Sequence, residues 1–129
     1  MNEKKIQPVI TPKAPAAIGP YSQGISAGEL VFVSGQTPLR ADGSLVDGPV
    51  GEQTEQCLRN VLEILLAAGL TMDAVVKTTV YMTDLGKFAE MNAVYTKRFK
   101  APFPARATVQ VAALPKGAGV EIDAVAVRP

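Results

Sequence analysis

The chain has 129 residues, of which 47% are hydrophobic and 19% are charged, and its formal net charge is +1. It contains no histidine and a single cysteine, Cys57. Proton relays through histidine, histidine-ligated metal sites and thiolate cages are therefore excluded, and we expect no metal ion and no cofactor. An enzyme of this composition acts through carboxylates, hydroxyls, arginine or lysine, main-chain groups and water.

Charge and hydropathy also limit the partners and the location of the protein. Thirteen basic residues are balanced by twelve acidic ones and only 5% of the chain is aromatic, whereas nucleic-acid binders usually carry a basic stripe interleaved with aromatic residues. The longest strongly apolar stretch, residues 64–70, is far shorter than the ~20 residues of a membrane span. The N-terminus lacks the apolar core of a secretory signal, and an unpaired cysteine fits a reducing compartment. We expect a cytoplasmic protein that binds neither nucleic acid nor membranes.

The pattern of apolar residues, glycines and prolines predicts one domain over residues 1–129, with an extended segment over residues 1–13. Short apolar or alternating runs bounded by turn residues are typical of strands. The predicted strands lie at residues 23–27, 30–34, 75–83, 106–114 and 120–127, with a further short strand near 7–11.

Two segments have helical periodicity. Apolar residues recur on one side of a helix over residues 53–68, and Gly69 can adopt the left-handed conformation that ends it. Asp84 is a suitable N-cap for a second helix over residues 85–99. The apolar stripe of this second helix consists of Phe88, Met91, Tyr95 and Phe99.

The order of elements is β-β-α-β-α-β-β, which predicts an α+β fold with two helices packed on one face of a mixed sheet. In residues 75–83, the period of two predicts a face made of Val76, Thr78, Val80 and Met82. The opposite face of the sheet carries many small or apolar residues, and no predicted helix remains to cover it. Such a face is usually covered by another subunit, so we expect an oligomer.

Arg106 is the first candidate for chemistry, because it follows a proline-rich loop and begins a predicted strand. A guanidinium at such a rigid position can bind a carboxylate with two parallel hydrogen bonds. The same pattern fits a surface arginine, or an arginine that forms an ion pair with Glu121 or Asp123. Spacing alone favours these structural interpretations.

Glu121 and Asp123 are two residues apart in a predicted strand, so both side chains project from the same face. In an adjacent pair of carboxylates, one member can have a raised pKa and act as acid or base. An alternating strand with carboxylates on its solvated face has the same pattern, and by itself this second interpretation is favoured.

Four further residues are weaker candidates. Tyr21 follows a rigid Gly-Pro turn, and Ser34 ends an apolar strand where it either faces a pocket or starts the loop. Asn92 lies on the apolar stripe of the second helix, where a buried amide is either a satisfied structural group or a hydrogen-bonding group of a pocket. Cys57 is interpreted as a small buried hydrophobe and not as a nucleophile.

Five segments together resemble the reactive intermediate deaminases, the RidA or YjgF-type family of enamine/imine deaminases. The resemblance extends from about Ala14 to the C-terminus. The segments are residues 14–24 (APAAIGPYSQG), 33–36 (VSGQ), 76–80 (VKTTV), 103–106 (FPAR) and 120–127 (VEIDAVAV).

This resemblance implies a chorismate-mutase-like fold and a homotrimer with pockets at the subunit interfaces. It implies hydrolysis of 2-imino acids, such as 2-iminopropanoate from 2-aminoacrylate, to 2-keto acids and ammonia, which protects pyridoxal-phosphate enzymes. Arg106 matches the family arginine that binds the substrate carboxylate, and Glu121 matches the acid that positions or activates water. The positions that match pocket-lining residues are Tyr21, Ser34 and Asn92, and main-chain groups near Ala107 and Thr108 are placed to hold the imine nitrogen.

One residue departs from the family pattern. Many members have cysteine two residues after the arginine, where this chain has Thr108, and the difference bears on substrate range more than on activity. Two other functional classes occur among relatives: a non-catalytic metabolite-binding or stress-response module, and an endoribonuclease or translation inhibitor. Intact Arg106 and Glu121 weigh against the first class, and the balanced charge weighs against the second.

Overall fold

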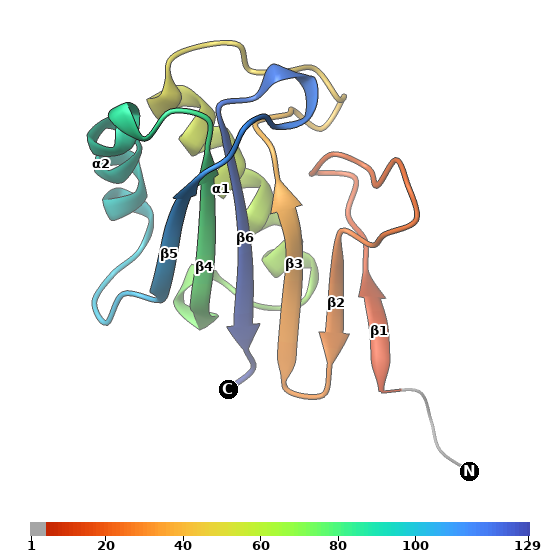
Figure 1. Ribbon diagram of the computed structural model, residues 1–129. Coiled ribbons are helices and arrows are strands. Elements are labelled where there is room, and N and C mark those ends of the chain that lie inside the picture. Colours follow the sequence, from red (N-terminus) through yellow and green to blue (C-terminus); the bar gives the residue numbers. More distant parts are fainter. Residues whose placement is uncertain (1–4) are drawn as a thin grey trace.

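The computed structural model describes residues 5–129, which form a single six-stranded sheet with two helices on one of its faces (Figure 1). The strands are β1 (Ile6–Val9), β2 (Gly24–Ala27), β3 (Leu30–Gln36), β4 (Val75–Met82), β5 (Ala105–Gln110) and β6 (Val120–Val127). The helices are α1 (Val50–Ala67) and α2 (Phe88–Arg98). Short 3-10 turns cover Met72–Ala74, Leu85–Lys87 and Pro115–Gly117.

The strand order is β1-β2-β3-β6-β4-β5, and only the β4–β5 pair is parallel. The α+β class, the mixed sheet and the predicted order of elements are therefore confirmed, and the short strand expected near 7–11 is present as β1. The part of the extended segment that comprises residues 1–4 lies outside the described residues. The core lies between the sheet and α1, which packs against β3 and β6, and it includes Leu58, Ile64 and Leu65.

The first helix begins three residues earlier than the pattern predicted. Pro49 is its N-cap residue, and the backbone N–H of Gly51 donates to Oε2 of Glu90 in α2. This first turn carries no apolar stripe of its own, so periodicity could not detect it.

The second helix begins later than predicted. The carboxylate of Asp84 accepts a hydrogen bond from Gly86, but it caps the 3-10 turn Leu85–Lys87, and α2 starts at Phe88. Strand β5 ends at Gln110 and not at Leu114, because β4, its only neighbour in the sheet, ends at Met82.

The alternation expected in β4 is correct for three of its four predicted residues. Thr78, Val80 and Met82 are fully buried on the helix side. A register shift against β6 between Val75 and Lys77 places Val75 in the core and leaves Val76 46% exposed. The assignment of Val76 to the buried face was therefore wrong, because a local bulge interrupts the period of two.

The face of the sheet opposite the helices, here called the open face, has apolar side chains at its surface. Phe32 and Val127 follow buried neighbours in their strands, Val109 lies in β5, and the three side chains are between 37% and 42% exposed. Within residues 5–129, both helices pack on the other face (Figure 1). None of the described helices is long and apolar enough to span a membrane.

Candidate active site

Arg106 lies in β5, the edge strand of the sheet, beside Thr78 of β4. Its guanidinium lies on the helix side, where Nη1 donates a hydrogen bond of 2.7 Å to Oδ1 of Asn92. Cζ lies 4.6 Å from the ring centroid of Tyr95 and 5.4 Å from that of Phe88. A guanidinium has five N–H donors, so this arrangement orients the group and leaves donors for a ligand carboxylate.

The three residues that hold this guanidinium come from one side of α2. Phe88, Asn92 and Tyr95 are four and three residues apart, which is the spacing of neighbours on a helix face. Burial raises the pKa of Tyr95, and its hydroxyl shares a hydrogen bond of 2.7 Å with Oγ1 of Thr78. The aromatic residues were predicted only as core, although the polar Asn92 between them was the available signal.

A depression of about 280 Å³ adjoins the guanidinium. It is lined by Asn92, Tyr95, Thr96, Phe103, Pro104 and Arg106. Its volume is just below the range typical of drug-sized ligands, so it suits a small carboxylic acid.

Thr108 lies two residues after Arg106 in β5, so its side chain projects on the same side of the strand. Its Oγ1 is buried and has no hydrogen-bond partner among residues 5–129. A buried hydroxyl without a partner costs stability. This atom is therefore available to form a hydrogen bond with a ligand bound beside the arginine. Ala107, between the two, is exposed, and it belongs to a strand with only one neighbour in the sheet.

Glu121 and Asp123 lie on the open face of β6, as their spacing predicted. Asp123 accepts hydrogen bonds from the backbone N–H of Thr79 at 3.0 Å and from the hydroxyl of Tyr81 at 3.1 Å. Glu121 is half-buried, and this burial, with the nearby charge of Asp123, raises the pKa of its carboxyl. Of the two carboxylates, Glu121 therefore has the properties of an acid or base.

Tyr21 and Ser34 are connected to this carboxylate through Gly35, which follows Ser34 in the chain and shares a depression with Tyr21. Gly35 approaches Glu121 so closely that a Cβ at residue 35 would collide with the carboxylate oxygen, which explains the glycine. Tyr21 and Gly35 line one depression of about 200 Å³, and the hydroxyl of Ser34 donates to the carbonyl of Ser22.

Sequence analysis did not assign a role to Gln23, which fixes the loop that carries Tyr21. Its buried amide accepts from the backbone N–H of Thr11 and donates to the carbonyls of Thr11, Ala14 and Pro15. One side chain thus joins two parts of a loop that has no helix or strand of its own. The sequence shows only a glutamine after a proline-rich segment, and its burial is not visible before folding.

Within one chain the two candidate groups do not meet. Arg106 contacts α2 on the helix side of the sheet, whereas Glu121 lies on the open face. Strand β4 also separates them, since β6 and β5 are its two neighbours. The ion pair of Arg106 with Glu121 or Asp123, considered above, is therefore not formed. A site that uses both groups requires a second copy of the chain.

The remaining candidate, Cys57, is fully buried, and its thiol is 3.6 Å from the carbonyl of Val120. Burial raises the pKa of this thiol well above its ordinary value, so little thiolate is present at neutral pH. The structure agrees with its interpretation as a buried hydrophobe.

The chain is similar in sequence to one described protein family and to several named proteins. The sequence profile of a family described as Endoribonuclease L-PSP matches residues 11–128. A human protein named 2-iminobutanoate/2-iminopropanoate deaminase is 49% identical over 121 residues, which cover 93% of this chain and 88% of the relative. An Arabidopsis thaliana protein named Reactive Intermediate Deaminase A, chloroplastic, is 51% identical over 95% of this chain and 66% of the relative.

Solved structures agree with these relatives. The crystal structure of E. coli TdcF with bound serine matches with a TM-score of 0.91 and 44% sequence identity, over 95% of this chain and 99% of that chain. The match therefore extends over nearly the whole of both chains.

Proposed function

Since the chain belongs to the reactive intermediate deaminase family, whose profile is described as Endoribonuclease L-PSP, we propose that it hydrolyses 2-imino acids to 2-keto acids and ammonia. A substrate of this class is 2-iminopropanoate, which forms from the enamine 2-aminoacrylate. Removal of such enamines in the cytoplasm protects pyridoxal-phosphate enzymes from them. The reaction needs no cofactor, because the carbon of a protonated imine is already electrophilic.

The observation that carries this proposal is the oriented guanidinium of Arg106. Asn92 and the rings of Tyr95 and Phe88 hold it at the edge of a small depression, with N–H donors left for a ligand. A 2-imino acid has a carboxylate beside the reacting carbon, so binding of the carboxylate fixes the position of that carbon. The serine in the crystal structure of the E. coli relative has a carboxylate as well.

Glu121 supplies the proton transfers in this mechanism. Its raised pKa makes the carboxylate a stronger base than an ordinary glutamate, so it can accept a proton from the attacking water. The water oxygen bonds to the imine carbon, and the resulting carbinolamine receives the proton on its nitrogen. Ammonia then leaves as the C–N bond breaks, and the carbon–oxygen double bond forms as the hydroxyl proton passes to the carboxylate of Glu121. Tyr21 lines a depression together with Gly35, the glycine that lies against this carboxylate, and there it limits access of bulk water.

The complete site combines two subunits. One subunit supplies Arg106, Asn92 and the unpaired hydroxyl of Thr108, and Glu121 of the partner subunit supplies the base. This assembly is supported by the separation of Arg106 and Glu121 on opposite faces of the sheet and by the apolar side chains of the open face. A cyclic homotrimer contains three such sites, one at each subunit interface.

The proposal is tested by replacing Arg106. We expect Arg106→Ala to lower the catalysed rate by about 100-fold or more, because the substrate is no longer oriented. Arg106→Lys should also be poor, since an ammonium cannot form two parallel hydrogen bonds with a carboxylate. The measurement is release of pyruvate from freshly generated 2-aminoacrylate, compared with the spontaneous rate.

Lys87→Ala is the matched control, because Lys87 is exposed and lies outside the depression. Gel filtration of each variant establishes that the oligomer is intact. Undiminished acceleration by Arg106→Ala would overturn the role of the arginine. No acceleration by the unmodified chain would instead favour a non-catalytic metabolite-binding module.

A further inference from the structure

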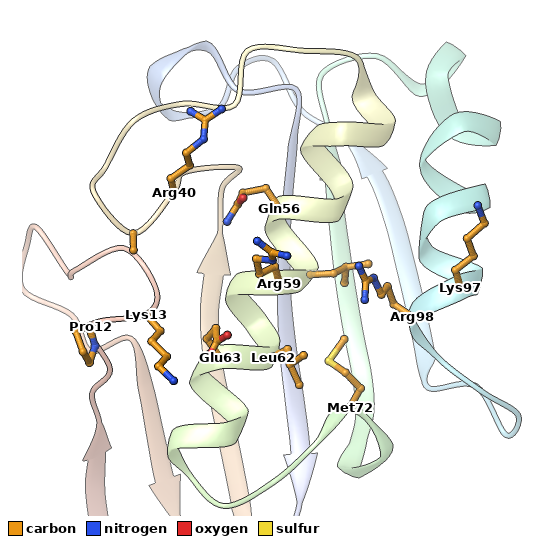
Figure 2. A pocket seen from close by; sticks show the side chains of 12 residues that line it. Pro12, Lys13, Arg40, Gln56, Arg59, Leu62, Glu63, Met72, Lys97 and Arg98 are labelled. Carbon is orange, nitrogen blue, oxygen red and sulfur yellow. The ribbon is translucent and has the colours of Figure 1, made fainter.

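A wide hollow of the described structure has neither Arg106 nor Glu121 in its lining. It has a volume of about 790 Å³ and runs over the outer side of α1 (Figure 2). Its lining comes from the N-terminal loop, the loop after β3, α1 and the C-terminal end of α2. We name it the outer groove, and its charged lining residues are Lys13, Arg40, Arg59, Glu63, Lys97 and Arg98.

The outer groove is strongly basic in a chain whose overall charge is balanced. It gathers five of the thirteen basic residues and one of the twelve acidic residues, Glu63. In Figure 2, Arg59 lies between Lys13 and Arg40 on one side and Lys97 and Arg98 on the other. Like charges gathered around one hollow repel each other, and a bound anion removes that repulsion.

Three of these cations are available to a ligand. The side chains of Lys13, Arg59 and Lys97 are exposed and form no hydrogen bond or ion pair within residues 5–129. The other two are engaged, since Arg98 forms an ion pair with Glu55 and Arg40 donates to Ser44 and Leu45.

The floor of the outer groove is apolar. Leu62 of α1 and Met72 of the following turn, both partly exposed, line it beside the charged side chains (Figure 2). A compact inorganic anion would contact only the cations, and the apolar side chains of the floor would remain exposed to water. A ligand that covers the floor and contacts separate cations needs an apolar ring and several negative charges.

We propose that the outer groove binds a nucleoside polyphosphate, with its base on the apolar floor and its phosphates at the free cations. The volume is within the range of small-ligand sites. A nucleic-acid strand is less suited to this groove, since no aromatic side chain lines it to stack successive bases. The site is independent of the proposed deaminase site, because Arg106 and Glu121 do not line it.

The outer groove is separate from the depression beside Arg106. The two hollows share no lining residue, and neither Arg106 nor Asn92 lines the groove. A nucleotide bound in the groove therefore leaves these residues of the proposed deaminase site unoccupied.

The first test is calorimetric titration of the full chain with ATP, adenosine and inorganic tripolyphosphate. We expect saturable ATP binding in the micromolar range, weaker binding of tripolyphosphate and much weaker binding of adenosine, and we expect added salt to weaken the ATP complex. Absence of saturable ATP binding at millimolar concentration would overturn the proposal. Equal affinity for ATP and adenosine would do the same, and tighter binding of a single-stranded RNA at the same cations would replace it with a nucleic-acid site.

Two lysines at opposite ends of α2 make a matched pair of variants. Lys97 lines the outer groove, whereas Lys87 precedes the helix and does not. We expect Lys97→Ala to weaken ATP binding by about threefold to tenfold and Arg59→Ala by about tenfold or more, while Lys87→Ala leaves it unchanged. Equal losses in Lys97→Ala and Lys87→Ala would show attraction by total charge and contradict a built site.

Methyl resonances locate the ligand independently. Met72 lines the outer groove, and Met91 is fully buried in the core. ATP should shift the methyl signal of Met72 and leave that of Met91 unchanged, and ATP affinity should be unaffected by Arg106→Ala. A shift at neither methionine, together with loss of affinity in Arg106→Ala, would place ATP in the deaminase site and overturn the proposal.

Discussion

Glu121 is a carboxyl group that folding makes harder to ionise. Its burial and the charge of Asp123 both raise its pKa, so the folded chain holds this proton more tightly than the unfolded chain does. A raised carboxyl pKa contributes its full stability only below the unfolded pKa, and this stability is lost as the pH rises through the folded pKa. The property that suits Glu121 to proton transfer therefore costs stability at neutral pH.

Glu121→Gln should accordingly stabilise the protein at neutral pH by a few degrees in Tm, and should change Tm little at about pH 4. Deaminase activity should fall in the same variant, because the amide cannot accept the proton. Thermal unfolding of both proteins across this pH range measures the effect. Glu29→Gln, which removes an exposed carboxylate, is the control, and an equal gain from Glu121→Gln at both pH values would contradict the assignment.

At the level of elements, β5 and α2 form one unit around Arg106. The strand brings the arginine to the edge of the sheet, and three residues on one side of the helix orient its guanidinium. Tyr95 has a second role, since its hydroxyl is hydrogen-bonded to Thr78 in β4 and so joins the helix to the buried side of the sheet.

Tyr95→Phe separates these two roles of the tyrosine. The ring beneath the guanidinium remains, but Thr78 is left buried and unpaired, which should cost about 1–3 kcal/mol in the free energy of unfolding. Adding Thr78→Val should recover much of that loss, because neither polar group then remains. Urea unfolding of both single variants and the double variant gives the coupling energy, and purely additive losses would contradict a shared hydrogen bond.

For the whole molecule, the position of Arg106 and Glu121 on opposite faces leads to a complementation experiment. Chains with Arg106→Ala and chains with Glu121→Ala should each be inactive alone, and mixed trimers should regain activity. In a random equal mixture, an intact arginine faces an intact glutamate at about one quarter of the interfaces, so about a quarter of the activity should return. The measurement is deaminase activity after the two variants are refolded together.

The control for complementation mixes Arg106→Ala with Asn92→Ala. One subunit supplies both of these residues to the proposed site. No mixed interface therefore regains both, and activity should not exceed the mean of the two variants. Light scattering of the unmodified chain should give the mass of three subunits. Failure of the first mixture to recover activity in intact trimers would show that the two residues do not share an interface.

Most of the fold was predictable from the sequence because the local signals agree with one another. Apolar periodicity gave the helices and strands, and Gly69 marked the end of the first helix. The errors arose where contacts between elements decide the local structure. The Gly51–Glu90 hydrogen bond supports a first helical turn that has no apolar stripe, and a bulge in β4 exchanges Val75 for Val76 in the core.

The sequence by itself determined which chemistry is available, since a chain without histidine is restricted to carboxylates, hydroxyls, arginine or lysine, main-chain groups and water, and five ordered segments indicated the family. Only the tertiary structure decided how those groups are arranged. The side of the sheet on which each residue lies depends on strand order and register, which join residues far apart in the chain. The same reason explains the outer groove: its cations are dispersed along a sequence of balanced charge, and only folding brings them together.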